Sequence, residues 1–497
     1  MRERYVGRHR RAPSLASLAD RAAQGAGVTL ATQLVRAALQ FGSVVVLARL
    51  LTPEDFGLLA MVISVIGIAD LIRDFGLSSA AIQSRELSED EKTNLFWANL
   101  GLGTACALLA LAARPLIVAA YGEPRIGPVV VALAGVFVLS GANTQFRADL
   151  ARSMRFGRIS ASDLIAQLCG IAVAVGCARA GLGLWALVAQ QLTVAVVALA
   201  VNVGNTSWRP GLPRRGVSLA RFFRFGGGLL GTQAVAYVTK NVDNVALGAV
   251  WGAVPLGLYS RAYQLLMMPL NQINAPMTNV ALPVLSRVQH DQRVFQRYLS
   301  RAQLVSCYAT ATVFAVAAGL AVPLVRLLFG PRWQGVAPIF AVLALGGVFR
   351  AVAQIAYWIF LARDRTAAQL KQDLVLRPVV IGMILAGLPW GAVGVAAGHS
   401  IAFFLYWIAT LVYVGRVAEV DVRPLFATAT RAIALVSAPC GAAAWLATLL
   451  PLPAAAQLLA GLAGAAGYVA AAGAVLPAVR SDLLDVLSFV RRSTGRR

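Results

Sequence analysis

Ionisable side chains stand inside long apolar stretches of this 497-residue sequence. A charged residue deep in a membrane helix costs about 2.5–3.5 kcal/mol on insertion scales, so it usually faces a cavity or a partner. The residues in this position are Arg36, Asp70, Lys240, Asp243, Arg350 and, nearer the outer end of its stretch, Arg261. We expect these side chains to line or brace an internal cavity.

Two local pairings could neutralise four of these charges. Lys240 and Asp243 are three residues apart and share one helix face, and Arg36 could meet Asp70 on the next segment. These pairs could equally serve only to hold helices together. Arg350 and Arg261 have no carboxylate nearby in sequence. If both face one cavity, it is net cationic and suits an anionic headgroup such as pyrophosphate, whose oxygens a guanidinium binds bidentately.

The apolar stretch 255–284 is unusually polar for a membrane helix. It contains Pro269, Asn271, Gln272, Asn274, Pro276 and Asn279. Amides that face a water-filled cavity could bind sugar hydroxyls, and Tyr357 and Trp358 could stack on sugar rings. Hydrogen bonds between helices explain the same amides equally well.

The sequence contains no catalytic or metal-binding pattern. Its five cysteines lie in apolar stretches without CxxC spacing, and no histidine stands at ligand spacing beside them. A Ser-His-Asp set, a Walker loop and a GxGxxG unit are also missing. We therefore expect no catalytic residue, no metal and no cofactor. Without a nucleotide-binding motif, any work that the protein performs would have to draw on an ion gradient or on consumption of its ligand, and Asp70 or Asp243 could bind the H⁺ or Na⁺.

The elements that must position these residues are membrane helices. Hydrophobic residues make up 59% of the chain and charged residues 13%, with a mean hydropathy of +0.71, whereas an average soluble domain is about 25% charged. The sequence predicts an all-α integral membrane protein with about fourteen transmembrane helices. We place them at 26–50, 56–73, 94–113, 126–146, 160–178, 183–205, 225–250, 255–284, 302–325, 336–361, 373–389, 391–415, 426–449 and 454–477.

The distribution of basic residues predicts the orientation. The net charge is +23, but the basic residues come in short bursts between apolar stretches, which is typical of cytoplasmic loops and argues against nucleic-acid binding. With a cytoplasmic N-terminus, about 33 of the 44 Lys and Arg fall in inner segments. We therefore predict a multi-pass protein of the inner membrane with both termini in the cytoplasm. The amphipathic segment 285–301 and the basic tail could contact anionic membrane lipids.

The sequence resembles itself at an offset of 200 residues. Thr32-Gln33 recurs as Thr232-Gln233, and Gly57-Leu58 recurs as Gly257-Leu258. Six predicted spans separate the copies, so both enter the membrane in the same direction. This predicts two pseudo-symmetric six-helix lobes with a cavity between them. The expected domains are a basic N-terminus 1–24, an N-lobe 25–206, a basic linker 207–224, a C-lobe 225–416, two extra helices 417–477 and a basic tail 478–497.

A short motif joins the first two predicted spans. It reads LARLLTPEDFG at residues 47–57, and Asp74-Phe75-Gly76-Leu77 and PLGLYSRA at residues 255–262 follow it. These segments resemble the oligosaccharide (Wzx-type) flippases, the polysaccharide-exporter branch of the multidrug/oligosaccharidyl-lipid/polysaccharide superfamily. The resemblance implies a MATE-like, V-shaped alternating-access fold with a cationic central cavity. That family has no single invariant catalytic motif, so no individual residue role is carried over.

The resemblance also implies a cargo. It would be an undecaprenyl-pyrophosphate-linked oligosaccharide, an anionic lipid-linked sugar, flipped for the synthesis of capsule, exopolysaccharide or the O-antigen of lipopolysaccharide. The implied partners are membrane lipids and the polysaccharide polymerase machinery. The alternatives are a multidrug/cation antiporter, which would need an acidic or apolar cavity, and a peptidoglycan-precursor flippase. A membrane glycosyltransferase or polymerase would need a sizeable acidic outer loop, which the predicted topology does not contain.

Overall fold

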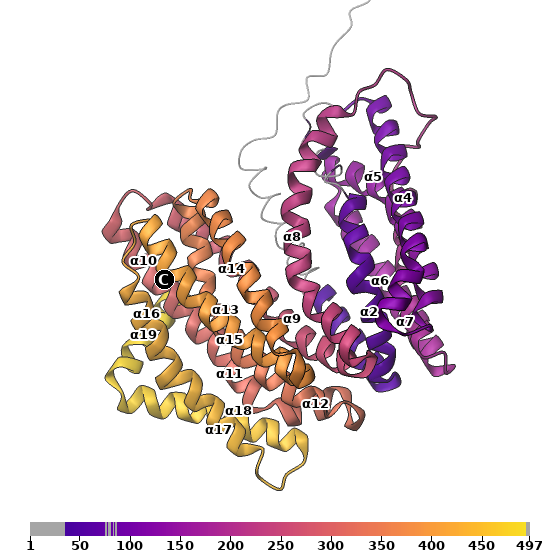
Figure 1. Cartoon of the computed structure of the whole chain (residues 1–497). Coiled ribbons are helices and arrows are strands. Elements are labelled where there is room, and N and C mark those ends of the chain that lie inside the picture. The colour runs from indigo at the N-terminus through magenta and orange to yellow at the C-terminus, as the bar shows by residue number, and fades with distance from the viewer. Residues whose placement is uncertain (1–34, 75–76, 78–80, 83, 85–86, 494–497) are drawn as a thin grey trace, which may run out of the picture. The chain divides into compact units, whose positions relative to one another are not determined.

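Helices make up every regular element in the described part of the chain (Figure 1). The computed structural model describes residues 35–74, 77, 81–82, 84 and 87–493, with all side chains except those of 71, 74, 225–236, 275, 276, 487 and 489–493. The predicted N-terminal segment 1–24, Thr32-Gln33 and Phe75-Gly76 therefore lie outside the described residues, as do the side chains of Thr232-Gln233.

Within the described residues, each predicted span falls on a helical segment. Residues 35–50 are helical. The α-helices that follow are α2 (Pro53–Asp74), α4 (Glu89–Tyr121), α5 (Ile126–Arg152), α6 (Phe156–Arg179), α7 (Leu184–Asn205), α8 (Ala220–Trp251), α9 (Ala253–Arg287), α10 (Gln292–Ser306), α11 (Thr312–Gly319), α12 (Ala321–Phe329), α13 (Val336–Ala362), α14 (Thr366–Ala386), α15 (Gly391–Val417), α16 (Arg423–Ala432), α17 (Ala438–Ala447), α18 (Ala454–Val475) and α19 (Pro477–Ser493).

The chain divides into two compact units. Unit 1 comprises Met1–Leu47, Ala69–Ala112 and Val131–Gly231, and unit 2 comprises Ala48–Ile68, Ala113–Val130 and Thr232–Arg497. Helices α2, α4, α5 and α8 each contribute to both units. Each unit combines three separate stretches of the chain, whereas the predicted domains are continuous. The predicted domain boundaries therefore remain a prediction.

In unit 1, helices α4 and α5 pack closely through two glycines. A Cβ at Gly103 would lie 2.5 Å from the carbonyl oxygen of Phe137, and one at Gly141 would lie 2.6 Å from that of Asn99. Small residues at such positions let helix backbones approach where lipid gives no hydrophobic driving force for association.

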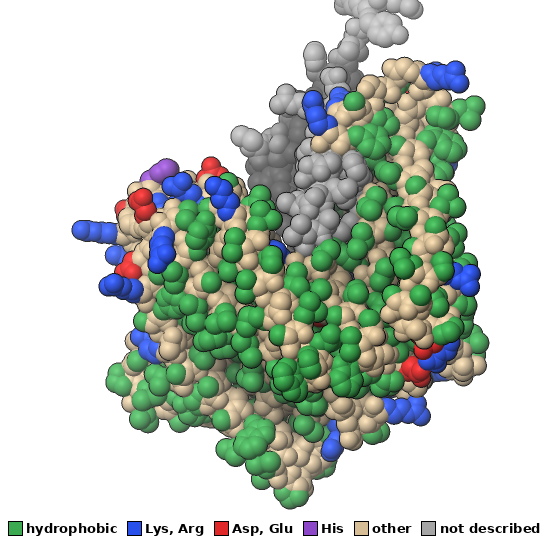
Figure 2. All heavy atoms as spheres, in the orientation of Figure 1, with side chains coloured by type: hydrophobic (Ala, Val, Ile, Leu, Met, Phe, Trp, Pro, Cys, Tyr) green, Lys and Arg blue, Asp and Glu red, His purple; other side chains and the backbone are tan. Residues whose placement is uncertain are grey.

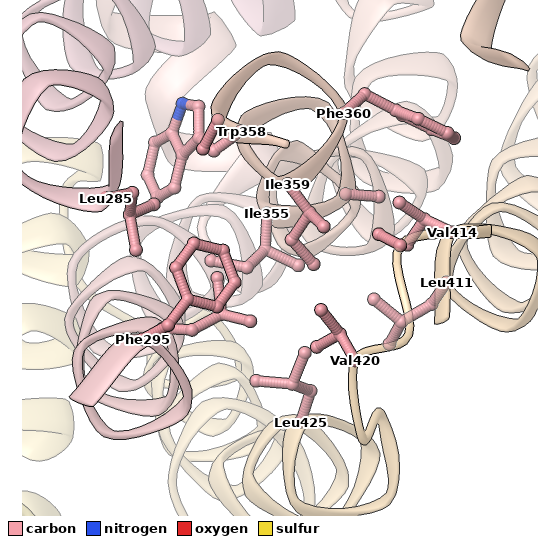
Figure 3. Close-up of a cluster of buried hydrophobic side chains, with 14 residues drawn as sticks. Leu285, Phe295, Ile355, Trp358, Ile359, Phe360, Leu411, Val414, Val420 and Leu425 are labelled. Carbon is pink, nitrogen blue, oxygen red and sulfur yellow. The ribbon is translucent and has the colours of Figure 1, made fainter. Parts of the chain in front are cut away.

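Unit 2 has an apolar core where α13 meets α9, α10 and α15. Figure 3 shows Trp358 beside Leu285, with Phe295 and Ile355 in the same cluster. Trp358 is 1% exposed, and its indole Nε1 donates to the Thr278 hydroxyl at 2.9 Å. The expectation that Trp358 stacks on sugar rings is therefore wrong, because its ring is a core residue.

The last helices of unit 2 form a second core. Val316 of α11 and Cys440 of α17 pack with Ala465 of α18. The carboxylate of Asp482, on α19, accepts a hydrogen bond from Arg431 at 2.6 Å and one from the Tyr308 hydroxyl at 3.2 Å. These contacts attach α19 to α16 and to the helical turn Cys307–Ala311.

Large apolar side chains are exposed along the helices. Leu116 on α4 is 72% exposed and Leu459 on α18 is 70% exposed. Figure 2 shows hydrophobic side chains over the middle of the visible face of unit 2, with Lys and Arg gathered around α10. Soluble proteins seldom expose large apolar patches. In a membrane protein, lipid covers an apolar surface of this kind.

Within the described residues, nine helical segments are long and apolar enough to cross a membrane. One of them, Thr366–Val417, has 52 residues and contains both α14 and α15, so it is long enough for two crossings. The chain is an all-helical membrane protein in this part, and the count of fourteen spans remains a prediction.

The backbones of α2 and α9 touch where the two helices cross. A Cβ at Gly57 would lie 1.8 Å from the carbonyl oxygen of Ala253, and one at Gly257 would lie 1.8 Å from that of Pro53. Residues 200 positions apart therefore make equivalent contacts here. Nearby, the Trp333 indole donates to the carbonyl of Ala48 at 2.6 Å. The motif at residues 47–57 thus takes part in helix packing.

The turn between α4 and α5 carries a cluster of three charges. The Arg125 guanidinium donates to Glu123 at 2.8 Å and to Glu54, on α2, at 2.6 Å. The hydrogen bonds from Arg125 hold the pKa of Glu123 below its usual range.

We expect this cluster to give a small acid-dependent contribution to stability. A depressed carboxyl pKa stabilises the fold above the unfolded value, about 4.3 for Glu, and that contribution is lost as the pH falls through the folded pKa. Because Arg125 is exposed and Glu123 is partly exposed, solvent screens the pair and the effect should stay below about 1 kcal/mol. Melting temperatures in detergent from pH 7 to pH 3 should fall less steeply for Glu123→Gln than for wild type. Equal slopes would contradict the prediction.

Candidate functional site

Unit 2 contains a pocket with a volume of about 360 Å³, within the range of small-molecule sites, about 300–1,000 Å³. Five helices supply its lining. The polar and aromatic lining residues are Thr239, Lys240 and Asp243 of α8, Tyr263 of α9, Arg350, Gln354, Tyr357 and Phe360 of α13, Gln369, Asp373 and Arg377 of α14, and His399, Phe403, Tyr406 and Thr410 of α15.

Helix α14 has two contrasting faces. Leu374 is 57% exposed and Val375 is 67% exposed, while Asp373 and Arg377 line the pocket. The pocket face continues at helical spacing through Gln369, Val380 and Ile384. An apolar outer face and a polar inner face are typical of a membrane helix that borders a water-accessible cavity.

Cations outnumber carboxylates in the pocket. Lys240, Arg350 and Arg377 face Asp243 and Asp373, which leaves a net charge of +1 when both carboxylates are ionised. Among the described residues, the one salt bridge within this set joins Arg377 Nη2 to Asp373 Oδ2 at 3.0 Å.

Arg350 lies between aromatic rings. Its guanidinium carbon is 4.6 Å from the centre of the Phe403 ring, and its Nη1 donates to the Tyr263 hydroxyl at 3.4 Å. These contacts hold the guanidinium in place without a direct salt bridge, so its remaining N–H groups can bind an anion.

Asp243 is held by its own partners rather than by Lys240. It is 3% exposed, accepts from the Tyr259 hydroxyl at 2.7 Å and accepts from the backbone N–H of Asn244 at 2.8 Å. The described residues contain no salt bridge between Lys240 and Asp243, so the expected local neutralisation of Lys240 is wrong. Lys240 is exposed whereas Asp243 is buried, so the ammonium stays hydrated instead of following the carboxylate into the core.

Aromatic side chains follow one another along the pocket. The Tyr263 and His399 rings are 5.7 Å apart, those of His399 and Phe403 are 4.7 Å apart, and those of Phe403 and Tyr406 are 5.9 Å apart. Tyr357 is 39% exposed and completes the aromatic lining. Aromatic faces of this kind bind the apolar faces of ligands.

Four of the nine residues expected at the site meet in this pocket. They are Lys240, Asp243, Arg350 and Tyr357. Arg261 lies outside the pocket lining, with its guanidinium carbon 4.5 Å from the centre of the Phe56 ring. Asn271 and Asn274 are on α9, also outside the lining; Asn271 is exposed and Asn274 is partly buried.

The remaining two expected residues belong to unit 1 and do not pair with each other. Arg36 donates to Asp163 at 3.1 Å, and Arg147 binds the same carboxylate at 2.6 Å. Asp70 instead pairs with Arg73, three residues along α2, at 2.8 Å. The expected Arg36–Asp70 pair is therefore wrong, because each residue has a better-placed partner.

Sequence reasoning missed the contribution of α14. The predicted span began at 373, which placed Arg377 near a membrane surface, where a long side chain can snorkel. The helix begins at Thr366, seven residues earlier, so Asp373 and Arg377 lie inside it. An acid and a base four residues apart on the face of Gln369 were the available signal. His399, Phe403, Tyr406 and Thr410 form a comparable stripe on α15.

Metal chemistry has no support in the described residues, which contain no group of three or more His, Cys, Asp or Glu side chains placed to hold an ion. The pocket offers charge, hydrogen bonds and aromatic surface.

Comparison with known families decides the family of the chain. The profile of the polysaccharide biosynthesis proteins matches residues 46–338, more than half of the sequence. The chain belongs to this family. Membership confirms the resemblance to the Wzx-type transporters and shows that this polysaccharide biosynthesis protein is a membrane transporter and not an enzyme.

Similar curated proteins come from several polysaccharide pathways. The lipopolysaccharide biosynthesis protein WzxC of Escherichia coli (strain K12) is 28% identical over 393 residues, which cover 77% of this chain and 78% of WzxC. The succinoglycan biosynthesis transport protein ExoT of Rhizobium meliloti (strain 1021) is 28% identical over 62% of each chain. The teichuronic acid biosynthesis protein TuaB of Bacillus subtilis (strain 168) is 24% identical over 60% of this chain and 62% of its own.

Solved structures establish the fold of this family member. The lipid II flippase MurJ, in an inward closed conformation, matches 89% of this chain and 98% of its own with a TM-score of 0.69 at 12% identity. An inward-facing multidrug resistance MATE family transporter of the MOP superfamily matches 77% of this chain and 94% of its own with a TM-score of 0.61 at 13% identity. The expected MATE-like, multi-pass membrane fold is confirmed at this level.

Proposed function

We propose that this transporter translocates undecaprenyl-pyrophosphate-linked oligosaccharide repeat units across the bacterial inner membrane, for assembly of capsule, exopolysaccharide or O-antigen. The observation that carries the proposal is the pocket of unit 2, where Lys240 and Arg350 stand beside aromatic rings within an apolar bundle. The cationic groups bind the pyrophosphate, and the rings and amides contact the sugars.

The charges of the pocket favour an anionic cargo. A guanidinium that is already positioned by Phe403 and Tyr263 binds phosphate oxygens with little further ordering. A lipid-linked pyrophosphate carries more than one negative charge, so it more than cancels the net charge of +1 that the lining supplies.

The names of similar proteins support the same cargo class. They include transporters or biosynthesis proteins for lipopolysaccharide, succinoglycan and teichuronic acid. All three are named for sugar polymers, and we propose for this chain a lipid-linked sugar as the substrate.

The mechanism we propose is alternating access. Fourteen spans would form two six-helix lobes, 25–206 and 225–416, with the helices of 417–477 added and both termini in the cytoplasm. Rocking of one lobe against the other would expose the cargo first to the inner and then to the outer side. An H⁺ or Na⁺ gradient, or consumption of cargo by the polymerase machinery outside, would supply the direction.

Two functions of the same superfamily compete with this proposal. They are a peptidoglycan-precursor flippase, which would share its role with MurJ, and a multidrug antiporter, which would share its role with the MATE transporter. Both likenesses are below 25% identity and support the fold alone. The family match and the surplus of cations in the pocket favour the polysaccharide precursor.

A reconstituted transport assay tests the proposal. The full chain in liposomes should move undecaprenyl-pyrophosphate-linked oligosaccharide, labelled on its sugar, from the outer leaflet to a position protected from a membrane-impermeant quencher. Liposomes without protein serve as the control. Deletion of the gene should trap the same lipid in the inner leaflet of the native membrane. Transport of lipid II at the same rate, or rescue of cells depleted of their lipid II flippase, would support the first competitor instead.

A further inference from the structure

The salt bridge of α14 stands in the pocket together with a tyrosine hydroxyl. Asp373 Oδ2 accepts from Arg377 at 3.0 Å, and Asp373 Oδ1 accepts from the Tyr406 hydroxyl at 3.2 Å. The side chain of Asp373 is 15% exposed and that of Arg377 is 32% exposed, so both are partly open to the pocket that they line.

This trio has unused hydrogen-bonding capacity of both kinds. An ionised carboxylate has about four acceptor positions and a guanidinium has five N–H donors. The contacts within the trio occupy two acceptor positions of Asp373 and one donor of Arg377. A ligand that carries adjacent donors and acceptors can therefore bind both groups at once.

The trio has no net charge to attract an anion. Asp373 and Arg377 neutralise each other, whereas Lys240 and Arg350 are held in no salt bridge among the described side chains. Helices α8 and α13 thus supply the groups suited to phosphate, and α14 with α15 supplies groups suited to a neutral polar ligand. Adjacent hydroxyls of a sugar ring provide such donors and acceptors in one plane.

Aromatic surface lies in the same lining. Tyr357, Phe360, Phe403 and Tyr406 border the pocket, and sugar rings present apolar C–H faces that pack against aromatic side chains. The Asp373–Arg377 pair with its aromatic neighbours therefore suits a neutral sugar, whereas Lys240 and Arg350 suit a phosphate.

We propose that Asp373, Arg377 and Tyr406 form a sugar-recognition subsite that binds adjacent hydroxyls of the sugar nearest the pyrophosphate. The inference rests on the proposed function, in which Lys240 and Arg350 hold the pyrophosphate. The subsite gives carriers that already bear sugar a higher affinity than the bare lipid carrier.

Binding of two lipids to the full chain in nanodiscs tests the subsite. The probes are undecaprenyl pyrophosphate and the same carrier with an oligosaccharide repeat unit, each competing with a fluorescent undecaprenyl pyrophosphate. Wild type should bind the sugar-bearing lipid more tightly than the bare one. Asp373→Asn should weaken binding of the sugar-bearing lipid by about tenfold, the value of about one hydrogen bond to a charged group. It should not weaken binding of the bare lipid, because the substitution removes a negative charge from the pocket.

Further variants separate recognition from folding. The exchanged pair Asp373→Arg with Arg377→Asp keeps a salt bridge but swaps donors and acceptors, so it should fold and lose the preference for sugar. Tyr406→Phe removes one hydroxyl and should lose part of the preference. Tyr298→Phe, on α10 and outside the pocket, is the matched control and should behave as wild type.

The outcomes distinguish the two proposals. If Asp373→Asn weakens the binding of both lipids equally, or of neither, the proposed subsite is contradicted even when wild type transports the cargo. If wild type binds neither lipid and transports no lipid-linked oligosaccharide, the proposed function itself fails.

Discussion

Arg350→Gln should lower the transport of lipid-linked oligosaccharide by about tenfold or more, because it removes a charge-assisted hydrogen bond to phosphate worth about 1.5–3 kcal/mol. The guanidinium is positioned by Phe403 and the Tyr263 hydroxyl, so Gln, which is shorter and neutral, cannot replace it. Arg350→Lys should recover part of the activity, since it restores the charge without the planar fork. Initial rates in proteoliposomes at matched protein content measure the effect.

Controls must show that Arg350→Gln acts on cargo binding and leaves the fold intact. Its melting temperature in detergent should stay close to that of wild type, since the aromatic packing of Tyr263 with His399 persists. Arg480→Gln, on the exposed side of α19, changes the net charge equally and should transport normally. Unchanged transport by Arg350→Gln at normal protein levels would remove the phosphate-binding role.

Gly57→Ala should destabilise the protein severely. The added Cβ would lie 1.8 Å from the carbonyl oxygen of Ala253, far inside contact distance, and a backbone atom cannot move aside as a flexible side chain can. The helices must separate, and overpacking in a tight core costs about 1–3 kcal/mol or more. Gly257→Ala should behave the same way, because its Cβ would meet the carbonyl oxygen of Pro53 at 1.8 Å. Expression level and melting temperature in detergent measure both.

A matched glycine supplies the control for this prediction. Gly101 lies within α4, and a Cβ there would meet no atom within 4 Å. Gly101→Ala should be neutral or slightly stabilising, by about 0.5–1 kcal/mol, because Ala favours the helix over Gly. If Gly57→Ala and Gly101→Ala have the same melting temperature, the close crossing of α2 and α9 does not contribute to stability.

The membrane character of the protein could be predicted from sequence because it depends on local composition. Each helix satisfies its own backbone hydrogen bonds and is apolar over the length of a bilayer, so the positions of α4 to α7 follow from hydropathy alone. The motif at residues 47–57 indicated the family, and the repeat contains Gly57 and Gly257, which the structure then places at a close helix crossing. These signals lie within single segments or at a constant offset.

Side-chain partners could not be predicted in this way. Arg36 was expected to meet Asp70 and instead binds Asp163, a residue 127 positions away. Trp358 was expected at the site and lies in the core, whereas its neighbour Tyr357 lines the pocket. Adjacent residues on a helix point about 100° apart, so the rotation of α13 within the bundle determines which of them reaches the cavity.

The sequence by itself determined that this chain is a helical membrane transporter with charges placed inside its spans, since hydropathy and family motifs are properties of contiguous residues. Only the tertiary structure decided which charges meet. It grouped Lys240, Asp243 and Arg350 with Asp373 and Arg377, and it placed Arg261 against Phe56 instead. The physical reason is that the pocket is formed by faces of five helices, and the packing that aligns those faces depends on contacts between residues far apart in the chain.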